Sequence, residues 1–152
     1  MRVGLISDTH GLLRPEALDF LAGADHIVHG GDIGSPEILE RLAAIAPLTV
    51  VRGNNDTAPW ARAIPETARV DLGNVALYAI HDLKELDIDP RAAGVRVVVS
   101  GHSHRPACTE RDSVLYVNPG SAGRRRFSLP IAAAELHIDG DAVHARIVTL
   151  VA

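Results

Sequence analysis

Residues 3–32 read VGLISDTHGLLRPEALDFLAGADHIVHGGD, and the order of elements in this stretch decides the fold. The short apolar run Val3–Ile6 predicts a strand that ends in a polar loop. Pro15–Ala22 predicts a helix, because proline is well tolerated in the first helical turn. His26–His29 predicts a second strand, which two glycines stop. A strand, a helix and a strand in this order imply parallel strands joined by a helical crossover.

The same alternation continues downstream. Ser35-Pro36-Glu37 is a good helix start, and the apolar face of that helix is formed by Ile38, Leu39, Leu42 and Ile45. We predict further strands at Leu48–Val51, Val75–Ile80, Val95–Val99, Val114–Val117, Ile131–Ile138 and Ala142–Val148. Thr57–Pro65 is expected to be a loop with a short turn, and Leu83–Asp89 is expected to be irregular. Parallel units first and antiparallel strands later predict an α/β (α+β) fold in one domain, residues 1–152, with two mixed β-sheets packed face to face and helices outside.

Composition and charge narrow the class of protein. The chain has 152 residues, of which 47% are hydrophobic and 22% are charged, so it can bury one core of ordinary size. The formal net charge of -4 argues against binding to the phosphate backbone of a nucleic acid. The single cysteine, Cys108, cannot form an internal disulfide. No apolar stretch approaches the roughly 20 residues of a membrane span, and the N-terminus enters a strand-like run rather than a signal-peptide layout. We therefore expect a cytoplasmic protein with no membrane partner.

Side chains that bind metals follow almost every predicted strand. They are Asp8, His10, Asp32, Asn54, His81, His102 and His104. In an open α/β sheet, ligands bind at the carboxyl ends of the strands, so we expect these residues to converge in one crevice. Nitrogen and oxygen ligands without sulfur suit Mn, Fe, Zn or Ni. Seven groups are too many for one tetrahedral ion and enough for two ions if a carboxylate bridges them.

The charge of such a centre indicates its substrate. Two divalent ions contribute four positive charges, and the two carboxylates and a bridging hydroxide remove three of them. A centre that stays positive while it holds a nucleophile suits an anionic phosphate. Two metals roughly 3.5–4 Å apart can activate water and stabilise the phosphate oxygens during in-line attack.

Five strings of the sequence resemble the motifs of the calcineurin-like metallophosphoesterases. They are Asp8-Thr-His10, Gly31-Asp32, Gly53-Asn54-Asn-Asp56, Gly101-His-Ser-His104 and Asn118-Pro-Gly-Ser121. Each string is weak alone, but the set occurs in order across most of the chain. The short chain resembles the small bacterial and archaeal phosphodiesterase branch of this family.

The resemblance implies a four-layer αββα sandwich with a dinuclear metal centre. It divides the ligands into three sets: Asp8, His10 and His104 for one ion, Asn54, His81 and His102 for the other, and Asp32 as the bridge. It also implies Mn as the most common activating ion, with Ni, Fe, Zn and Mg as alternatives, and a homo-oligomer such as a dimer or tetramer.

The function that we expect is hydrolysis of a small phosphate diester. Two departures from the family pattern bear on it. Asn55 stands where many members carry a histidine that assists the leaving group, and a neutral amide is a poor general acid. His81 is followed by Asp82, where glycine is typical. The alternatives are a phosphomonoesterase or nucleotide hydrolase of the same fold, and a non-catalytic protein-binding scaffold such as the retromer subunit that resembles it. The complete ligand set counts against the scaffold.

Several residues have two interpretations at this stage. Asn54 and Asp56 are candidate catalytic residues, but Asn54 also fits a turn after Gly53, and Asp56 also fits a cap of the following turn. The basic run Arg124, Arg125 and Arg126 is either a solvated face or a grip on substrate phosphate. The remaining histidines lie within predicted strands and are interpreted as structural: His26, His29, His137 and His144.

Overall fold

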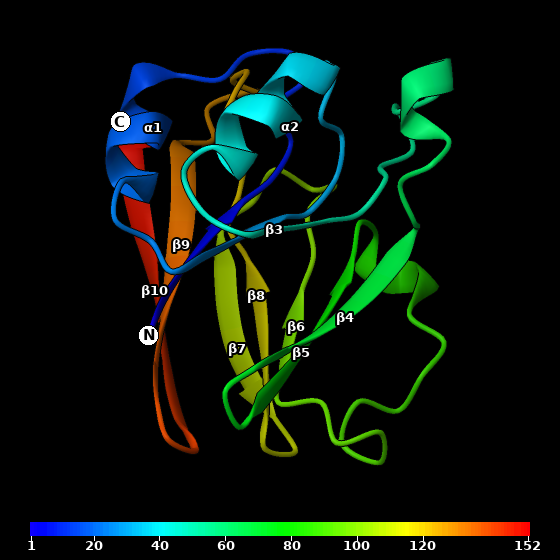
Figure 1. Cartoon of the computed structure of the whole chain (residues 1–152), viewed down its shortest axis with the longest axis vertical. Helices are drawn as coiled ribbons and strands as arrows, with labels where there is room; N and C mark the ends of the chain where they lie inside the picture. Colours follow the sequence, from blue (N-terminus) through cyan, green and yellow to red (C-terminus); the bar gives the residue numbers. More distant parts are fainter.

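The computed structural model describes all 152 residues and contains two five-stranded sheets that pack face to face (Figure 1). The first sheet has the order β10 (Ala142–Val151), β9 (Ile131–Asp139), β1 (Arg2–Ile6), β2 (His26–His29) and β3 (Leu48–Val50). The second sheet has the order β4 (Thr67–Leu72), β5 (Val75–Ile80), β6 (Val97–Val99), β8 (Val114–Asn118) and β7 (Ala107–Arg111). The helices are α1 (Pro15–Leu21) and α2 (Pro36–Ala43), with short 3-10 helices η1 (Pro59–Ala61) and η2 (Leu83–Glu85). None of the helices has the length and apolar character to span a membrane.

Both sheets are mixed, as the sequence predicted. The strands β1, β2 and β3 pair in parallel, and β9 and β10 extend the first sheet in antiparallel pairing. In the second sheet β5, β6 and β8 are parallel, whereas β4 and β7 pair antiparallel at the two edges. The α/β sandwich class is therefore confirmed.

Alternation along the strands builds the core in layers. Val3 and Leu5 of β1 point between the sheets, where they join Val28, Leu77, Val97, Val99 and Leu136. Ile6 and Ile27 point the other way, into a layer shared with Leu21 of α1 and Leu42 of α2. Because both helices bury one apolar stripe against the first sheet, they form its outer layer.

The outer face of the second sheet has a different cover. Ile80, Val98 and Val114 form a small cluster there, packed against Leu83, Leu86 and Ile88. These covering residues belong to η2 and the connection that follows it, which lies beside the second sheet in Figure 1. The outer face of the second sheet is thus covered by an irregular segment with a single 3-10 helix, and not by a layer of α-helices.

Three local predictions need correction. The edge strands β4 and β7 were not predicted. All five side chains of β7 are exposed, whereas β4 alternates three exposed polar residues with Ala68, Val70 and Leu72, which face the core. The predicted strand Val95–Val99 is shorter, since β6 begins at Val97. The region Leu83–Asp89 was predicted as irregular but contains η2, whose N-cap Asp82 accepts a hydrogen bond from the Lys84 amide.

Candidate metal centre

The loops that follow the parallel strands meet at one end of the sandwich. Backbone hydrogen bonds tie them together: the His10 amide donates to the Asp32 carbonyl at 2.9 Å, and the Gly101 amide donates to the His81 carbonyl at 2.9 Å. The first bond joins the loops after β1 and β2, and the second joins the loops after β5 and β6. Ligand-type side chains from distant parts of the chain are thereby brought to one place, as expected for strand ends of parallel sheets.

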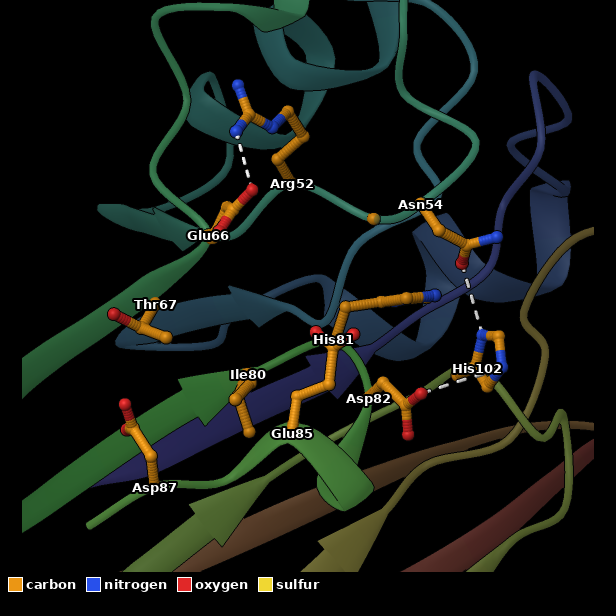
Figure 2. Close-up of a pocket in the computed structure, with 11 residues that line it drawn as sticks. Arg52, Asn54, Glu66, Thr67, Ile80, His81, Asp82, Glu85, Asp87 and His102 are labelled. Atoms are coloured by element: carbon orange, nitrogen blue, oxygen red, sulfur yellow. Dashed lines mark hydrogen bonds and ion pairs between the residues drawn. The ribbon is translucent and has the colours of Figure 1, made fainter.

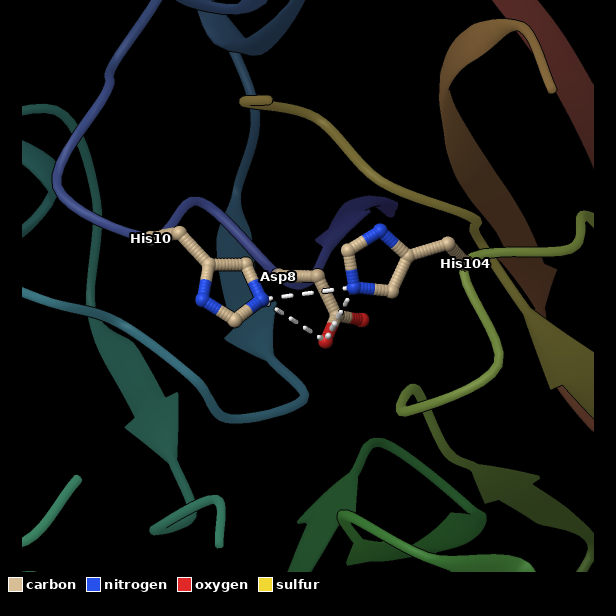
Figure 3. A group of neighbouring side chains, drawn as sticks. All are labelled: Asp8, His10 and His104. Atoms are coloured by element: carbon tan, nitrogen blue, oxygen red, sulfur yellow. Dashed lines mark hydrogen bonds and ion pairs between the residues drawn. The ribbon is translucent and has the colours of Figure 1, made fainter. Parts of the chain in front are cut away.

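One group of donors consists of Asp8, His10 and His104, whose ligand atoms all lie within 4.8 Å of one another. The Nε2 atoms of His10 and His104 are 3.3 Å apart. They lie 3.7 Å and 3.4 Å, respectively, from Oδ1 of Asp8. Figure 3 shows the two rings on either side of this carboxylate. Two imidazole nitrogens and a carboxylate oxygen that converge in this way form a suitable set for a divalent transition metal.

A second group consists of Asp8, Asp32 and His81. Nε2 of His81 lies 3.2 Å from Oδ2 of Asp32 and 4.0 Å from Oδ1 of Asp8. The same Oδ2 atom of Asp32 is 3.6 Å from Nε2 of His10. One carboxylate oxygen of Asp32 therefore faces both groups.

Asn54 and His102 form the exposed side of the second group. Nδ1 of His102 lies 3.1 Å from Oδ1 of Asn54, and the two side chains point toward each other in Figure 2. The His102 ring is 5.2 Å from the His81 ring, edge to face. All seven side chains singled out in the sequence therefore lie in one contiguous cluster, with Asn54 and His102 at its solvent side.

Unpartnered buried atoms support a metal-binding role. Oδ1 of Asp8, Nε2 of His81 and Nδ1 of His104 are buried and have no hydrogen-bond partner. Such atoms are costly to leave unpaired in a folded protein. For His81 the orientation is decided by the other nitrogen, since Nδ1 donates to the Gly30 carbonyl at 2.7 Å and leaves the Nε2 lone pair facing the carboxylates. The first two atoms face the interior of the cluster, where cations would satisfy them.

The protonation of the metal-free cluster follows from its mutual charges. Burial raises the pKa of Asp8, but attraction to the nearby His10 and His104 rings outweighs burial and holds this pKa below its usual value. Burial opposes ionisation of Asp32 as well, yet the close approach of the His81 ring, 3.2 Å away, leaves the pKa of Asp32 lowered. The nearby carboxylate of Asp8 raises the pKa of His10, and the nearby carboxylate of Asp32 raises the pKa of His81 against the effect of burial. The same carboxylates that would face metal cations thus favour protonation of His10 and His81 in the metal-free cluster.

The backbone of the cluster is strained. Eight residues other than glycine have positive φ, and the five at this site are Asp8 (55°), His10 (45°), Asp32 (57°), His102 (71°) and His104 (61°). Side chains other than glycine adopt this left-handed conformation rarely, and it costs free energy unless the surroundings impose it. Strain of this kind gathers where geometry serves function.

Two glycines allow the loops to approach the carboxylates. A Cβ atom at Gly53 would collide with the Asp32 carboxylate and its backbone nitrogen. A Cβ atom at Gly101 would collide with the Ser7 hydroxyl and would lie 2.7 Å from Oδ2 of Asp8. Only glycine leaves room for the ligands at these two positions.

Asp56 holds two ligand loops together. Its buried carboxylate accepts hydrogen bonds from the amides of Ile33 (2.9 Å), Gly34 (3.2 Å) and Gly53 (2.9 Å). These amides belong to the loops after β2 and β3. The sequence left open whether Asp56 orients a ligand or caps a turn, and these bonds favour a capping role that extends across both loops.

A buried chain of hydrogen bonds through His29 and Thr9, which the sequence did not reveal, connects the loops that carry the ligands. Nδ1 of His29 accepts from the Gly31 amide at 3.0 Å, and its Nε2 lies 3.0 Å from Oγ1 of Thr9, which itself donates to the Ile33 carbonyl at 2.8 Å. Burial lowers the pKa of His29 to about 4, so the ring is neutral. Thr9 lies between the candidate ligands Asp8 and His10 in the sequence. This position is the one sequence feature that could have indicated the hydrogen bonds through His29 and Thr9.

Polar contacts also fix the loops around Asp8 and His102. The Ser7 hydroxyl donates to Oδ2 of Asp8 at 2.8 Å, and the His102 amide donates to the same oxygen at 3.1 Å. The Asn118 side-chain amide donates to the Gly101 carbonyl at 2.9 Å. These bonds leave Oδ1 of Asp8 as the free ligand atom.

The basic run has mixed placement. Arg124 donates to the His10 carbonyl at 3.1 Å, and Arg125 donates to the carbonyl of Ala152 at 2.9 Å. Asp8 raises the pKa of His10, and the charge of Arg126 is close enough to oppose that rise. The run therefore borders the candidate centre, and all three arginines are exposed.

The two sheets and the ligands at their strand ends define an α/β sandwich protein with a metal-binding centre. This chain belongs to the calcineurin-like phosphoesterase superfamily, because the model of that superfamily's domain matches residues 1–141. The family comprises metal-dependent hydrolases of phosphate esters, and divalent metals are the ions that its members use. The resemblance seen in the five sequence motifs is thereby confirmed.

Individual relatives agree with this assignment. A probable metallophosphoesterase of Methanothermobacter thermautotrophicus is 35% identical, over 97% of this chain and 92% of the relative. The phosphodiesterase YfcE of Escherichia coli is 30% identical, over 91% of this chain and 89% of the relative. Vacuolar Protein Sorting 29 of Cryptosporidium parvum shares the fold, with a TM-score of 0.80, 21% identity and 97% coverage of both chains.

Proposed function

We propose that this chain is a metal-dependent phosphodiesterase that hydrolyses small phosphate diesters with two divalent ions. The observation that carries this proposal is that Oδ2 of Asp32 faces both donor groups, 3.2 Å from His81 and 3.6 Å from His10. A carboxylate in that position is suited to bridge two cations. Mn is the ion that we expect, and Ni, Fe, Zn and Mg are the alternatives.

The proposed ligand sets are those that the family resemblance implies, and the two donor groups are compatible with them. One ion would be held by Asp8, His10 and His104, the other by Asn54, His81 and His102, with Asp32 between them. When bound, such ions supply a water nucleophile at neutral pH and offset the negative charge of the phosphate. The protein contributes the ligand geometry and the hydrogen bonds that orient each ligand.

Asn55 restricts the reaction. Its backbone amide donates to Oδ1 of Asp32 at 2.9 Å, and its side-chain amide donates to Oδ2 at 3.0 Å. Asn55 therefore positions the proposed bridging carboxylate and offers no proton to a leaving group. We expect diesters of acidic alcohols, such as nitrophenol, to be cleaved faster than diesters of simple alcohols.

A metal screen tests the proposal. The protein is freed of metal and assayed with Mn, Ni, Mg and Zn against bis-p-nitrophenyl phosphate and p-nitrophenyl phosphate. Preference for the diester supports a phosphodiesterase, and preference for the monoester supports the phosphomonoesterase alternative. If no ion gives hydrolysis, the phosphodiesterase proposal fails and a protein-binding scaffold of the same fold becomes the better explanation.

Substitution of Asp32 tests the bridging role. We expect Asp32→Ala to lower kcat/KM by at least about 100-fold, because both ions lose a ligand. The matched control is Asp139→Ala, which removes an exposed carboxylate at the end of β9, away from the site. Activity of Asp32→Ala near that of the control would contradict the bridging assignment.

A further inference from the structure

A cavity of about 350 Å³ lies on the outer face of the second sheet, over β7 and β8. No α-helix covers this face, and the irregular segment after β5 packs on β5, β6 and β8. The edge strand β7 has no such cover, and all of its side chains are exposed. The cavity therefore occupies the space between η2 and this edge of the sheet.

The register of two strands gives the cavity a continuous floor. Ala107, Thr109 and Arg111 alternate along β7, so their side chains share one face of the sheet. Thr109 lies opposite Tyr116 of β8, and Ala107 lies opposite Asn118. All five residues line the cavity. The floor thus runs from the carboxyl end of β8 along β7 to Arg111.

The inner end of the cavity adjoins the candidate metal centre. His102, a candidate ligand, and Gly101 line this end together with Ser103. The Ser103 hydroxyl accepts hydrogen bonds from the Arg105 amide at 3.2 Å and from the Asn118 side chain at 3.1 Å. Its own proton has no acceptor in the protein and is free to be donated to a ligand. A substrate whose phosphate binds at the donor groups can therefore extend one alcohol arm into the cavity.

The cavity is positively charged. Lys84, Arg105 and Arg111 line it, and all three are exposed and form no ion pair with a carboxylate. The one carboxylate in the wall, Asp82, already has partners, since Oδ1 accepts from the Lys84 amide at 3.1 Å and Oδ2 lies 3.9 Å from Nε2 of His102. Three cations and one carboxylate give a formal charge of +2 with His102 neutral.

The apolar part of the wall strengthens this positive field. Leu83, Ala107 and Tyr116 contribute apolar surface to the cavity, and charges act more strongly beside walls of low dielectric constant. The Arg111 guanidinium lies over the Tyr116 ring, with its carbon 4.4 Å from the ring centroid. This contact orients Arg111, so less side-chain entropy is lost when the guanidinium binds an anion.

We propose that this cavity binds one alcohol arm of the diester and selects arms that carry a second phosphate. The proposal rests on the phosphodiesterase function proposed above. Arg105 and Arg111 bind the second phosphate, because a planar guanidinium pairs with two phosphate oxygens at once. The preferred substrate is then a diester with one anionic arm, such as a nucleotide that carries a further phosphate.

Two chromogenic diesters that differ by one phosphate test this selectivity. They are thymidine 5′-(p-nitrophenyl phosphate) and its derivative with a phosphate on the 3′ oxygen. The ratio of kcat/KM for the 3′-phosphorylated diester to kcat/KM for the other is measured for the wild-type protein and for Arg105→Gln/Arg111→Gln. We expect the ratio to fall about tenfold in the double variant, at about threefold for each exposed charge pair removed.

The matched control is Arg41→Gln/Arg91→Gln, which removes two exposed arginines that do not line the cavity. It changes the net charge of the protein by the same amount, so it corrects for long-range attraction of the more anionic substrate. The control should keep the wild-type ratio. A ratio that falls equally in both double variants, or in neither, overturns the cavity proposal.

Binding to the metal-free protein gives a readout that does not depend on hydrolysis. Thymidine 3′,5′-bisphosphate is titrated into ¹⁵N-labelled protein, with thymidine as the uncharged control ligand. We expect saturable shifts of the Ala107 and Thr109 backbone amides with the bisphosphate only. These shifts should be lost in Arg105→Gln/Arg111→Gln and kept in the control variant.

The two measurements separate the two proposals. If both diesters are cleaved but the ratio is unchanged in Arg105→Gln/Arg111→Gln and the bisphosphate causes no shifts, the cavity proposal is wrong and the phosphodiesterase proposal stands. If no ion supports hydrolysis but the bisphosphate shifts the cavity amides, the phosphodiesterase proposal is wrong and the anion-binding cavity stands. Equal shifts with the bisphosphate and with thymidine overturn the charge selectivity.

Discussion

Acid should destabilise this protein through His29, the buried histidine beneath the candidate metal centre. The ring is fully buried and neutral, and burial lowers its pKa from 6.5 to about 4. Its Nδ1 atom accepts a hydrogen bond from the Gly31 amide. Protonation turns that acceptor into a donor, so the bond next to Asp32 is lost.

The sign and size of the effect follow from the two pKa values. Because the folded-state pKa is lowered, the unfolded chain binds the proton more tightly than the folded protein does. The stability is fully present above pH 6.5 and is lost as the pH falls toward 4. The expected loss from His29 is about 2 kcal/mol between pH 8 and pH 5, and about 3 kcal/mol once the pH falls below 4.

Urea unfolding of metal-free protein, followed by circular dichroism at pH 8 and pH 5, measures this loss. We compare the wild type with His29→Gln, which removes the titrating group. Each protein is compared with itself at the two pH values, so the cost of altered packing cancels. The wild type should lose about 2 kcal/mol more than His29→Gln.

A matched control is His144→Gln, whose side chain is exposed on β10. It should keep the wild-type difference between pH 8 and pH 5. If His29→Gln loses as much stability on acidification as the wild type, the neutral buried imidazole is not the source of acid sensitivity, and the argument from burial is refuted.

Two further predictions concern the metal centre. Gly53→Ala forces a Cβ atom against the Asp32 carboxylate. We therefore expect the affinity for Mn²⁺ to fall at least about tenfold and the free energy of unfolding to fall by about 1–3 kcal/mol. Wild-type affinity in a calorimetric titration with Mn²⁺ would disprove the close-approach argument. The pKa values of His10 and His81 are raised in the metal-free protein, so Mn²⁺ must displace up to two protons at pH 6. Around this pH, the affinity for Mn²⁺ should weaken by up to about 100-fold for each unit by which the pH is lowered. Calorimetry in buffers of different ionisation enthalpy counts the released protons, and a count of zero at pH 6 would contradict the assigned proton positions.

The sequence alone determined the features that local chemistry and strand periodicity encode. Apolar runs such as Val3–Ile6 and His26–His29 predicted the parallel strands, because a buried strand must be apolar wherever it lies. The positions of Asp8 and His102 just after predicted strands indicated that they meet, because parallel strands direct their carboxyl ends to the same edge. The family was also accessible, because its motifs are short strings of ligands and glycines.

The tertiary structure decided what depends on partners distant in the chain. The edge strand β7 is exposed along its whole length, and pairing with β8 makes it a strand. By contrast, β4 carries an alternating pattern, with Ala68, Val70 and Leu72 toward the core, which the sequence interpretation missed. Asp56 looked like a cap or a ligand until three amides from two loops were found on its carboxylate. His29 could be placed within a strand, but its neutral state follows from burial and from Thr9, twenty positions away.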